Sequence, residues 1–260
     1  MSGMIRGAIP TALVLGAHTA AGAGVVCALI EAGSPVLAVG EPGEYLDALV
    51  EHYREEPQLT LLTRRQPIDE AGALALANEV RTRGLKLHAV FAHLFAPSFS
   101  GRLLEKSSER LGERFDTDVL SHLAAARHLL PLLQDEHATT HYVMIGGPAN
   151  ECGWAGHGHA SIGSAALHML ARVLHEEAIP LGVRVQLLAV EHPLSTPQNR
   201  AHACAGWPDA MSVGRKAVEL LRPAKPGPVR AIVRFDAAWT PPPLRTLFDP
   251  LPHKPSVSSA

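Results

Sequence analysis

Histidine and serine side chains with spacings suited to acid–base chemistry lie close together in the second half of this chain. His157 and His159 are followed by Ser161 and Ser164, all within about two helical turns. Histidine titrates near neutral pH, so His159 could act as a general acid or base. A nucleophilic Ser–His–Asp arrangement using Ser161 or Ser164 is a further candidate, although the chain contains no Gly-x-Ser-x-Gly sequence.

Three other candidates come from distant parts of the chain, namely His93, Asp118 and His192. In a doubly wound sheet such segments meet at the carboxyl edge of the strands, where Asp118 could orient a catalytic histidine. Because the chain has fifteen histidines, the alternative is that these side chains cap helices or line loops. A metal site that combines His157 and His159 with His93 or Asp118 lacks strict ligand spacing, so no metal is predicted.

A glycine-rich turn follows the first apolar run of the chain and opens a helix. Its sequence is Gly16-Ala17-His18-Thr19-Ala20-Ala21-Gly22-Ala23-Gly24. Glycines permit a tight turn and a close backbone approach, and the amides at a helix N-terminus can hold a pyrophosphate. The turn therefore predicts a dinucleotide site, and the alternative is a tight strand-to-helix turn without a ligand.

Short apolar runs alternate with longer helical patterns along most of the chain, and these are the elements that position the candidate residues. The expected strands are Thr11–Leu15, Val36–Val39, Leu59–Leu62, Ala89–Ala92, Tyr142–Ile145, Arg184–Val190 and Val229–Val233. The expected helices are Gly22–Ala32, Glu44–Arg54, Asp69–Arg83, Ser107–Leu133, Ser161–Ala178 and Met211–Leu221. This alternation predicts an α/β fold, a doubly wound, Rossmann-like, seven-stranded parallel sheet with helices on both faces.

Composition limits the class of protein. The chain has 260 residues, of which 47% are hydrophobic, and a net charge of -2, which argues against a nucleic-acid partner or an anionic membrane surface. No stretch of about 18 apolar residues is present, and three widely spaced cysteines do not indicate a disulfide framework. We therefore expect a cytoplasmic protein with an N-terminal extension (residues 1–10), one domain (residues 11–235) and a proline-rich tail (residues 236–260).

Several segments resemble the short-chain dehydrogenase/reductase family over roughly residues 10 to 235. The Gly-x-x-x-Gly-x-Gly turn of that family falls on Gly16, Ala20 and Gly22, so its middle glycine is alanine here. Residues 101–118 match the run that leads to the catalytic asparagine of the family, and residues 182–185 match its sixth strand. The resemblance implies a nicotinamide dinucleotide as cofactor and an oxidoreductase activity.

The resemblance also identifies candidate cofactor contacts outside the glycine turn. Glu41 follows the second strand, where a carboxylate accepts hydrogen bonds from ribose hydroxyls and repels a 2′-phosphate, so NAD is favoured over NADP. The alternative is that Glu41 is a solvated loop residue and that no cofactor binds. Gln66 falls at the adenine-side position, Ala92 in the loop after the fourth strand, and Thr196 where it could face a nicotinamide amide. His18 lies within the turn itself.

The catalytic residues of the family are missing. That family uses a tyrosine and a lysine four residues later, with a serine that polarises the substrate. The tyrosine and lysine positions fall on Ala160 and Ser164, the serine position falls near Gly146 and Gly147, and the asparagine position carries Asp118. The residues four after Tyr45, Tyr53 and Tyr142 are Leu49, Pro57 and Gly146, so no Tyr-x-x-x-Lys sequence exists. Carbonyl reduction by the mechanism of the family is therefore not expected.

Three functions are compatible with these observations. The first is a non-catalytic binding protein or subunit, forming a homodimer, a homotetramer or a hetero-oligomer with an active homologue through residues 107–133 and 161–178. The second is an NAD-dependent oxidoreductase with a non-standard proton donor such as His159. The third is a cofactor-independent dehydratase, isomerase or cyclase that acts on a small hydrophobic ligand with His159, His93 and Asp118.

Overall fold

The computed structural model describes residues 11–64, 69–95, 100–147, 153, 155–222 and 229–235. Seven parallel strands form one sheet in the order β3-β2-β1-β4-β5-β6-β7. Their bounds are β1 Thr11–Leu15, β2 Val36–Gly40, β3 Leu59–Thr63, β4 Leu87–Ala92, β5 Thr140–Gly146, β6 Val183–Ala189 and β7 Ile232–Arg234. The predicted doubly wound parallel sheet is thus confirmed. Gln66, the N-terminal extension and the tail lie outside the described residues.

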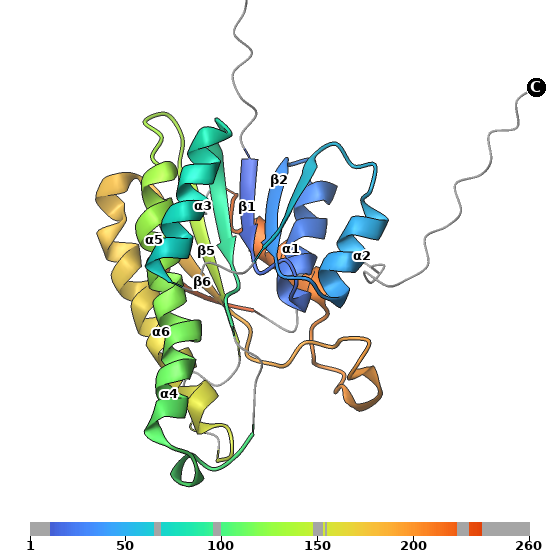
Figure 1. Ribbon diagram of the computed structural model, residues 1–260, viewed down its shortest axis with the longest axis vertical. Helices are drawn as coiled ribbons and strands as arrows, with labels where there is room; N and C mark the ends of the chain where they lie inside the picture. Colours follow the sequence, from blue (N-terminus) through green and yellow to red (C-terminus); the bar gives the residue numbers. More distant parts are fainter. Residues whose placement is uncertain are drawn as a thin grey trace, which may run out of the picture.

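Helices cover both faces of the sheet (Figure 1). Helices α3, α5 and α6 pack on one face, and α1, α2 and α7 pack on the other. The α-helices are α1 Ala20–Glu31, α2 Glu44–His52, α3 Glu70–Thr82, α4 Ser108–Phe115, α5 Ser121–Leu129, α6 Gly158–Glu177 and α7 Ala210–Glu219. The central strands are buried on both faces, which is why they read as continuous apolar runs in the sequence.

Three predicted elements differ clearly from the observed ones. Helix α6 begins at Gly158 rather than at Ser161, which places His159 inside its first turn. Strand β7 is shorter than predicted because it pairs with β6 only opposite Leu187–Ala189. The single helix predicted over residues 107–133 is continuous through α4 and α5, but it contains a π-helical turn at Asp116–Leu120 and ends in a 3-10 turn at Leu130–Leu132.

The order of the strands reverses between β1 and β4, since β2 and β3 lie on one side of β1 and β4 to β7 lie on the other. Ligands of open α/β sheets bind outside the carboxyl ends of the strands at such a switch point. Figure 1 shows two groups of segments beyond this edge: the start of α4 with the start of α6, and the loop between β6 and α7. Among the described helices, none is long and apolar enough to span a membrane.

Candidate functional site

The turn between β1 and α1 lies at the switch point, and close backbone contacts hold it there. Gly16 has a φ of +85°, and a Cβ on it would lie 2.1 Å from the carbonyl oxygen of His93. A Cβ on Gly22 would lie 2.1 Å from the carbonyl oxygen of Gly16, and one on Gly40 would lie 2.9 Å from the amide nitrogen of His18. Only glycine fits these positions, so the turn, the end of β2 and the end of β4 form one compact cradle.

Thr19 organises the cradle through three hydrogen bonds. Its hydroxyl donates to the carbonyl of Gly16 (2.8 Å) and accepts from the amide of Gly22 (3.1 Å), which caps α1. Its Oγ1 also lies 2.9 Å from Nδ1 of His93. Because the single hydroxyl proton is used toward Gly16, Nδ1 of His93 must donate in this third bond. His93 is therefore fixed as the Nδ1–H tautomer, with Nε2 as an acceptor.

An aromatic chain continues from His93 into the interior. The rings of His93 and Phe95 are 5.0 Å apart, and the rings of Phe95 and His122 are 5.9 Å apart. Burial lowers the pKa of His93 to about 4, and the nearby imidazole of His18 adds to the shift. Burial also lowers the pKa of His122, which is 0% exposed, to about 3, and His93 contributes to that shift. Both rings are therefore neutral at pH 7.

The low pKa of His122 predicts a pH-dependent stability. In the unfolded chain this side chain takes up a proton below about pH 6.5, whereas in the folded protein it stays neutral. The unfolded state thus gains protons as the pH falls, and His122 alone lowers the free energy of unfolding by about 2 kcal/mol between pH 7 and pH 5. In His122→Gln we expect the loss of stability between these pH values, measured by urea denaturation, to shrink by that amount.

The control for this experiment is His192→Gln, because His192 is exposed. It should leave the pH dependence of the unfolding free energy as in the parent protein. An identical loss of stability from pH 7 to pH 5 in His122→Gln and in the parent would show that His122 is not held neutral by burial.

Glu41 borders the cradle at the end of β2. Burial lowers the pKa of His18, and the nearby Glu41 carboxylate partly opposes this shift, so the two side chains are close enough to interact. Four of the predicted cofactor contacts, Gly16, His18, Gly22 and Glu41, are thus brought together. Ala92 lies at the end of β4, paired with Leu15 of β1 directly before the glycine turn.

A hollow of about 260 Å³ lies next to the first residue of α1. Predicted contacts Ala20 and Thr196 both line it, with other lining residues Tyr45, Ser195, Pro197, Arg200, Trp207, Asp209, Ala210 and Met211. The loop after β6 is held against α2 over this hollow. The hydroxyl of Tyr45 donates to Oε1 of Gln198 (3.2 Å), and Nε2 of Gln198 donates to Oε2 of Glu44 (2.5 Å).

Asp118 lies in the π-helical turn, in an ion pair with Arg114. The turn forms because the amide of Ser121 donates to the carbonyl of Asp116, five residues earlier. Nε of Arg114 is 2.5 Å from Oδ2 of Asp118, and the two side chains are 6% and 1% exposed. A Cβ on Gly163 of α6 would lie 3.4 Å from Oδ2 of Asp118, so the pair is buried beneath α6.

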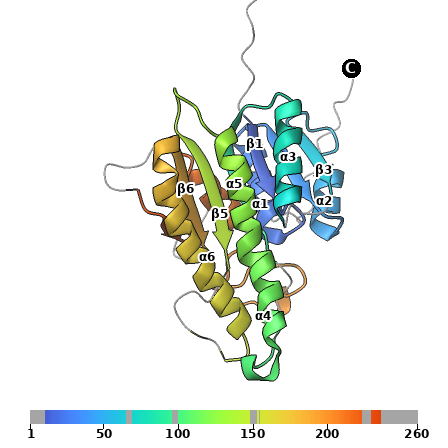
Figure 2. The same ribbon diagram turned by 60° about the vertical axis from the view of Figure 1, so that its left-hand side comes forward.

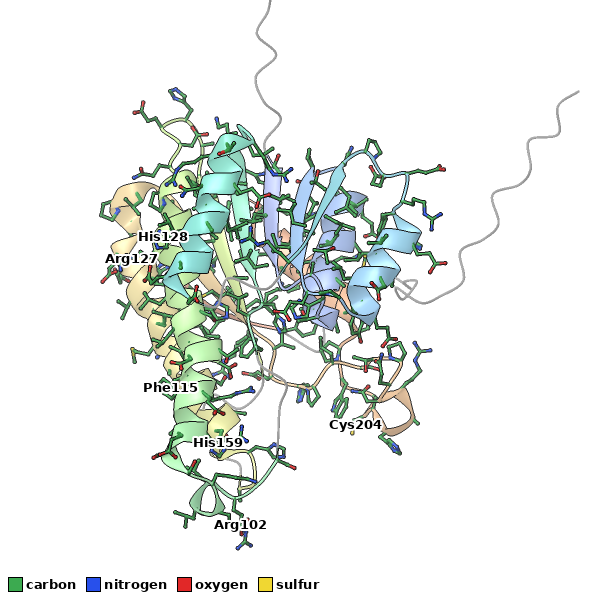
Figure 3. All side chains as sticks on the ribbon, viewed as in Figure 1. Arg102, Phe115, Arg127, His128, His159 and Cys204 are labelled. Carbon is green, nitrogen blue, oxygen red and sulfur yellow. The ribbon has the colours of Figure 1, made fainter. Side chains whose placement is uncertain are left out.

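The remaining predicted catalytic residues lie along the start of α6. His159 is 4% exposed, and Figure 3 shows it in the extension formed by α4 and α6. The hydroxyl of Ser164 is buried and donates to the carbonyl of Gly147 (3.4 Å). Helix α6 contains no tyrosine and no lysine. His157 precedes α6 and does not cap it through its side chain, and His192 is exposed.

Sequence reasoning missed three residues of this region: Thr19, Arg114 and His122. Thr19 could have been identified, because threonine directly before a helix is a common N-cap. Arg114 and His122 lie four residues before and after Asp118, which is the spacing of side chains on one helix face. Within the described ranges, no three His, Cys, Asp or Glu side chains are grouped so that they could hold a metal ion.

No family model and no curated protein matches this chain. Solved structures do match it. A short-chain dehydrogenase from Streptomyces avermitilis is 20% identical, with a TM-score of 0.71 over 90% of this chain and 91% of its own. A short-chain dehydrogenase/reductase from Serratia marcescens is 15% identical, with a TM-score of 0.75 over 88% of this chain and 97% of its own. ElxO with NADP bound is 13% identical, with a TM-score of 0.74 over 88% of this chain and 98% of its own. The chain has the fold of short-chain dehydrogenases/reductases.

Proposed function

We propose that the protein binds NAD at the carboxyl edge of its sheet and acts as a non-catalytic binding subunit with an oxidoreductase fold. One observation carries this proposal. The glycine cradle is present, whereas the positions that hold the catalytic residues in the family are occupied here by side chains engaged in internal contacts or without an acidic group. Ala160 has no acidic group, Ser164 is bonded to a backbone carbonyl, and Asp118 is paired with Arg114. A carbonyl substrate would find no tyrosine or lysine on α6 to supply its proton.

The chemistry of the cradle supports NAD as the ligand. The amides at the start of α1 suit a pyrophosphate, and the absence of a Cβ on Gly16 and Gly22 lets it approach the backbone closely. Arg200 lines the hollow beside Ala20 and adds positive charge there. The Glu41 carboxylate suits a pair of ribose hydroxyls and disfavours a 2′-phosphate. The structure of ElxO contains NADP, so the proposed preference for NAD rests on Glu41 of this chain and not on the similarity to ElxO.

The neutral state of His93 and His122 argues against either of them as a proton donor in place of the missing tyrosine. A side chain whose pKa is about 4, as for His93, carries almost no acidic proton at neutral pH and is a weak general acid there. The pKa of His122 is lower still, and its side chain is completely buried. His159 thus remains the proton donor for the second function, an NAD-dependent oxidoreductase.

The test combines binding with turnover. The purified protein is titrated with NAD and NADP, and NADH oxidation is then followed with a panel of aldehydes and ketones. We expect saturable NAD binding and no turnover above the rate without protein. Turnover that disappears in His159→Ala would replace the proposal with the second function. Activity without any dinucleotide binding would support the third, a cofactor-independent dehydratase, isomerase or cyclase.

We further propose that the subunit is a homodimer formed through α5 and α6. These helices lie side by side on one face of the molecule (Figure 2). These two helices and the π-helical turn before α5 carry large apolar side chains that are 40–55% exposed: Leu120, Leu123, Met169 and Val173. The small residues of these helices are divided: Ala124 and Ala125 are buried in the core of the subunit, whereas Ala165 is exposed and Ala166 is half-buried. A second copy related by a two-fold axis would cover the apolar stripe.

Introducing a charge into the stripe should separate the subunits. In a two-fold interface Val173→Glu acts twice and places an unpaired carboxylate in a desolvated contact. We expect a dimer for the parent protein in light scattering and a monomer for this variant. Val50→Glu is the matched control, because Val50 of α2 is 44% exposed and Val173 is 45% exposed. A monomeric parent, or a Val173→Glu variant that stays dimeric, would contradict the proposed interface.

A further inference from the structure

A second hollow, of about 310 Å³, lies between α6 and the edge strand β7. Its lining is strongly basic and consists of His168, Arg172, Arg230, Ile232, Val233 and Arg234. Among the described residues, no aspartate or glutamate belongs to this lining. It shares no residue with the hollow beside α1, so it is a separate feature of the molecule.

The local fold brings these cationic groups together. His168 and Arg172 are one turn apart on α6 and so occupy the same helix face. Arg230 and Arg234 flank Ile232, which packs against the core beneath α6. The main chain at Arg230 is held by Nε2 of Gln186, which donates to its carbonyl oxygen (2.9 Å). The arginines are therefore placed by ordered backbone rather than by long surface loops.

Within the described residues, only part of the positive charge of this hollow is compensated. Arg234 is 2.9 Å from Oε1 of Glu191, which offsets one charge. Arg172 and Arg230 have no ion pair with any residue in the described part of the chain. The whole chain carries a net charge of -2, so this excess is a local concentration and not a reflection of overall basicity. Arginines held around one hollow repel one another, and an anion between them removes that repulsion.

We propose that this hollow binds a small dianion with a phosphate group or paired carboxylates. Guanidinium groups match the geometry of both through two parallel N–H···O hydrogen bonds. Arg172 on α6 and Arg230, two residues before β7, have no ion pair within the described residues and hold the anion between them. Ile232 and Val233 line the same hollow and offer contact to an apolar part of the ligand.

Calorimetric titrations with inorganic phosphate, pyrophosphate and citrate test this site, at constant ionic strength set by sodium chloride. We expect at least one of these anions to bind the full-length protein saturably. The affinity should fall at least tenfold in Arg172→Gln/Arg230→Gln. Arg54→Gln removes one exposed arginine charge elsewhere and should bind like the parent. Comparison of the phosphate and citrate titrations identifies which acid group is preferred.

Binding that is equal in the parent and in Arg172→Gln/Arg230→Gln would place the anion elsewhere, for example at the glycine turn, and would overturn the proposal. Absence of binding by all three anions would also overturn it. A double variant with fewer subunits per particle in light scattering would show that an acidic surface of another chain fills the hollow, which contradicts a small ligand. Since α6 and β7 lie outside the cradle, failure here leaves the NAD proposal intact.

Discussion

Asp118→Asn is expected to lower the free energy of unfolding by about 3–5 kcal/mol, although asparagine is nearly the same size. The reason is the guanidinium of Arg114, which is only 6% exposed and would lose the carboxylate that compensates its charge. An unpaired charge in a desolvated position is far more costly than the loss of the pair as a whole. Urea denaturation of the variant and the parent at pH 7 measures this difference.

The control removes both charges. In Arg114→Met/Asp118→Leu the desolvation of two ions no longer opposes folding, so most of the lost stability should return. If Asp118→Asn is as stable as the parent, the carboxylate does not stabilise the fold through this pair. The catalytic role that the sequence position of Asp118 suggested would then regain support.

Gly22→Ala is expected to weaken NAD binding by about 100-fold or more, which corresponds to about 2.7 kcal/mol of binding free energy. The added Cβ would lie 2.1 Å from the carbonyl oxygen of Gly16 and 2.6 Å from its carbonyl carbon, both backbone atoms. The turn must therefore open, which moves the amides at the start of α1 away from the pyrophosphate. Calorimetric titration with NAD, below the unfolding temperature of the variant, measures the loss.

Gly112→Ala is the matched control for this variant. A Cβ on Gly112 meets nothing within 4 Å, and the residue lies in α4, so alanine should leave NAD binding unchanged and favour the helix slightly. Equal NAD affinity in Gly22→Ala and Gly112→Ala would show that the dinucleotide does not bind at the turn.

The sequence predicts the central sheet well because its strands are apolar on both faces. Strand β1 has the predicted bounds, Thr11–Leu15, and all five of its residues are buried. The start of α6 is predicted less well, since Ser161 has the typical character of an N-cap. In the structure its amide and its hydroxyl both donate to the carbonyl of His157, which places Ser161 inside the first turn.

The glycine turn could be identified from the sequence because its residues are consecutive, whereas its polar contacts could not. Thr19 and His93 are 74 residues apart, and only the pairing of β1 with β4 brings them together. Arg114 and Asp118 have the four-residue spacing of an ion pair on one helix face, but the π-helical turn that contains Asp118 and the close approach of Gly163, which bury the pair, are seen only in the structure. No pattern in the sequence indicates that turn.

A calorimetric titration of the parent protein with NAD and, separately, with NADP tests the proposed cofactor site most directly. The cradle and the Glu41 carboxylate predict saturable binding of NAD, with NADP at least tenfold weaker because its 2′-phosphate meets a negative charge. If neither dinucleotide binds, the glycine turn is only a structural connection. If NADP binds more tightly, Glu41 does not contact the ribose. Either result would contradict an NAD site formed by the glycine turn and Glu41.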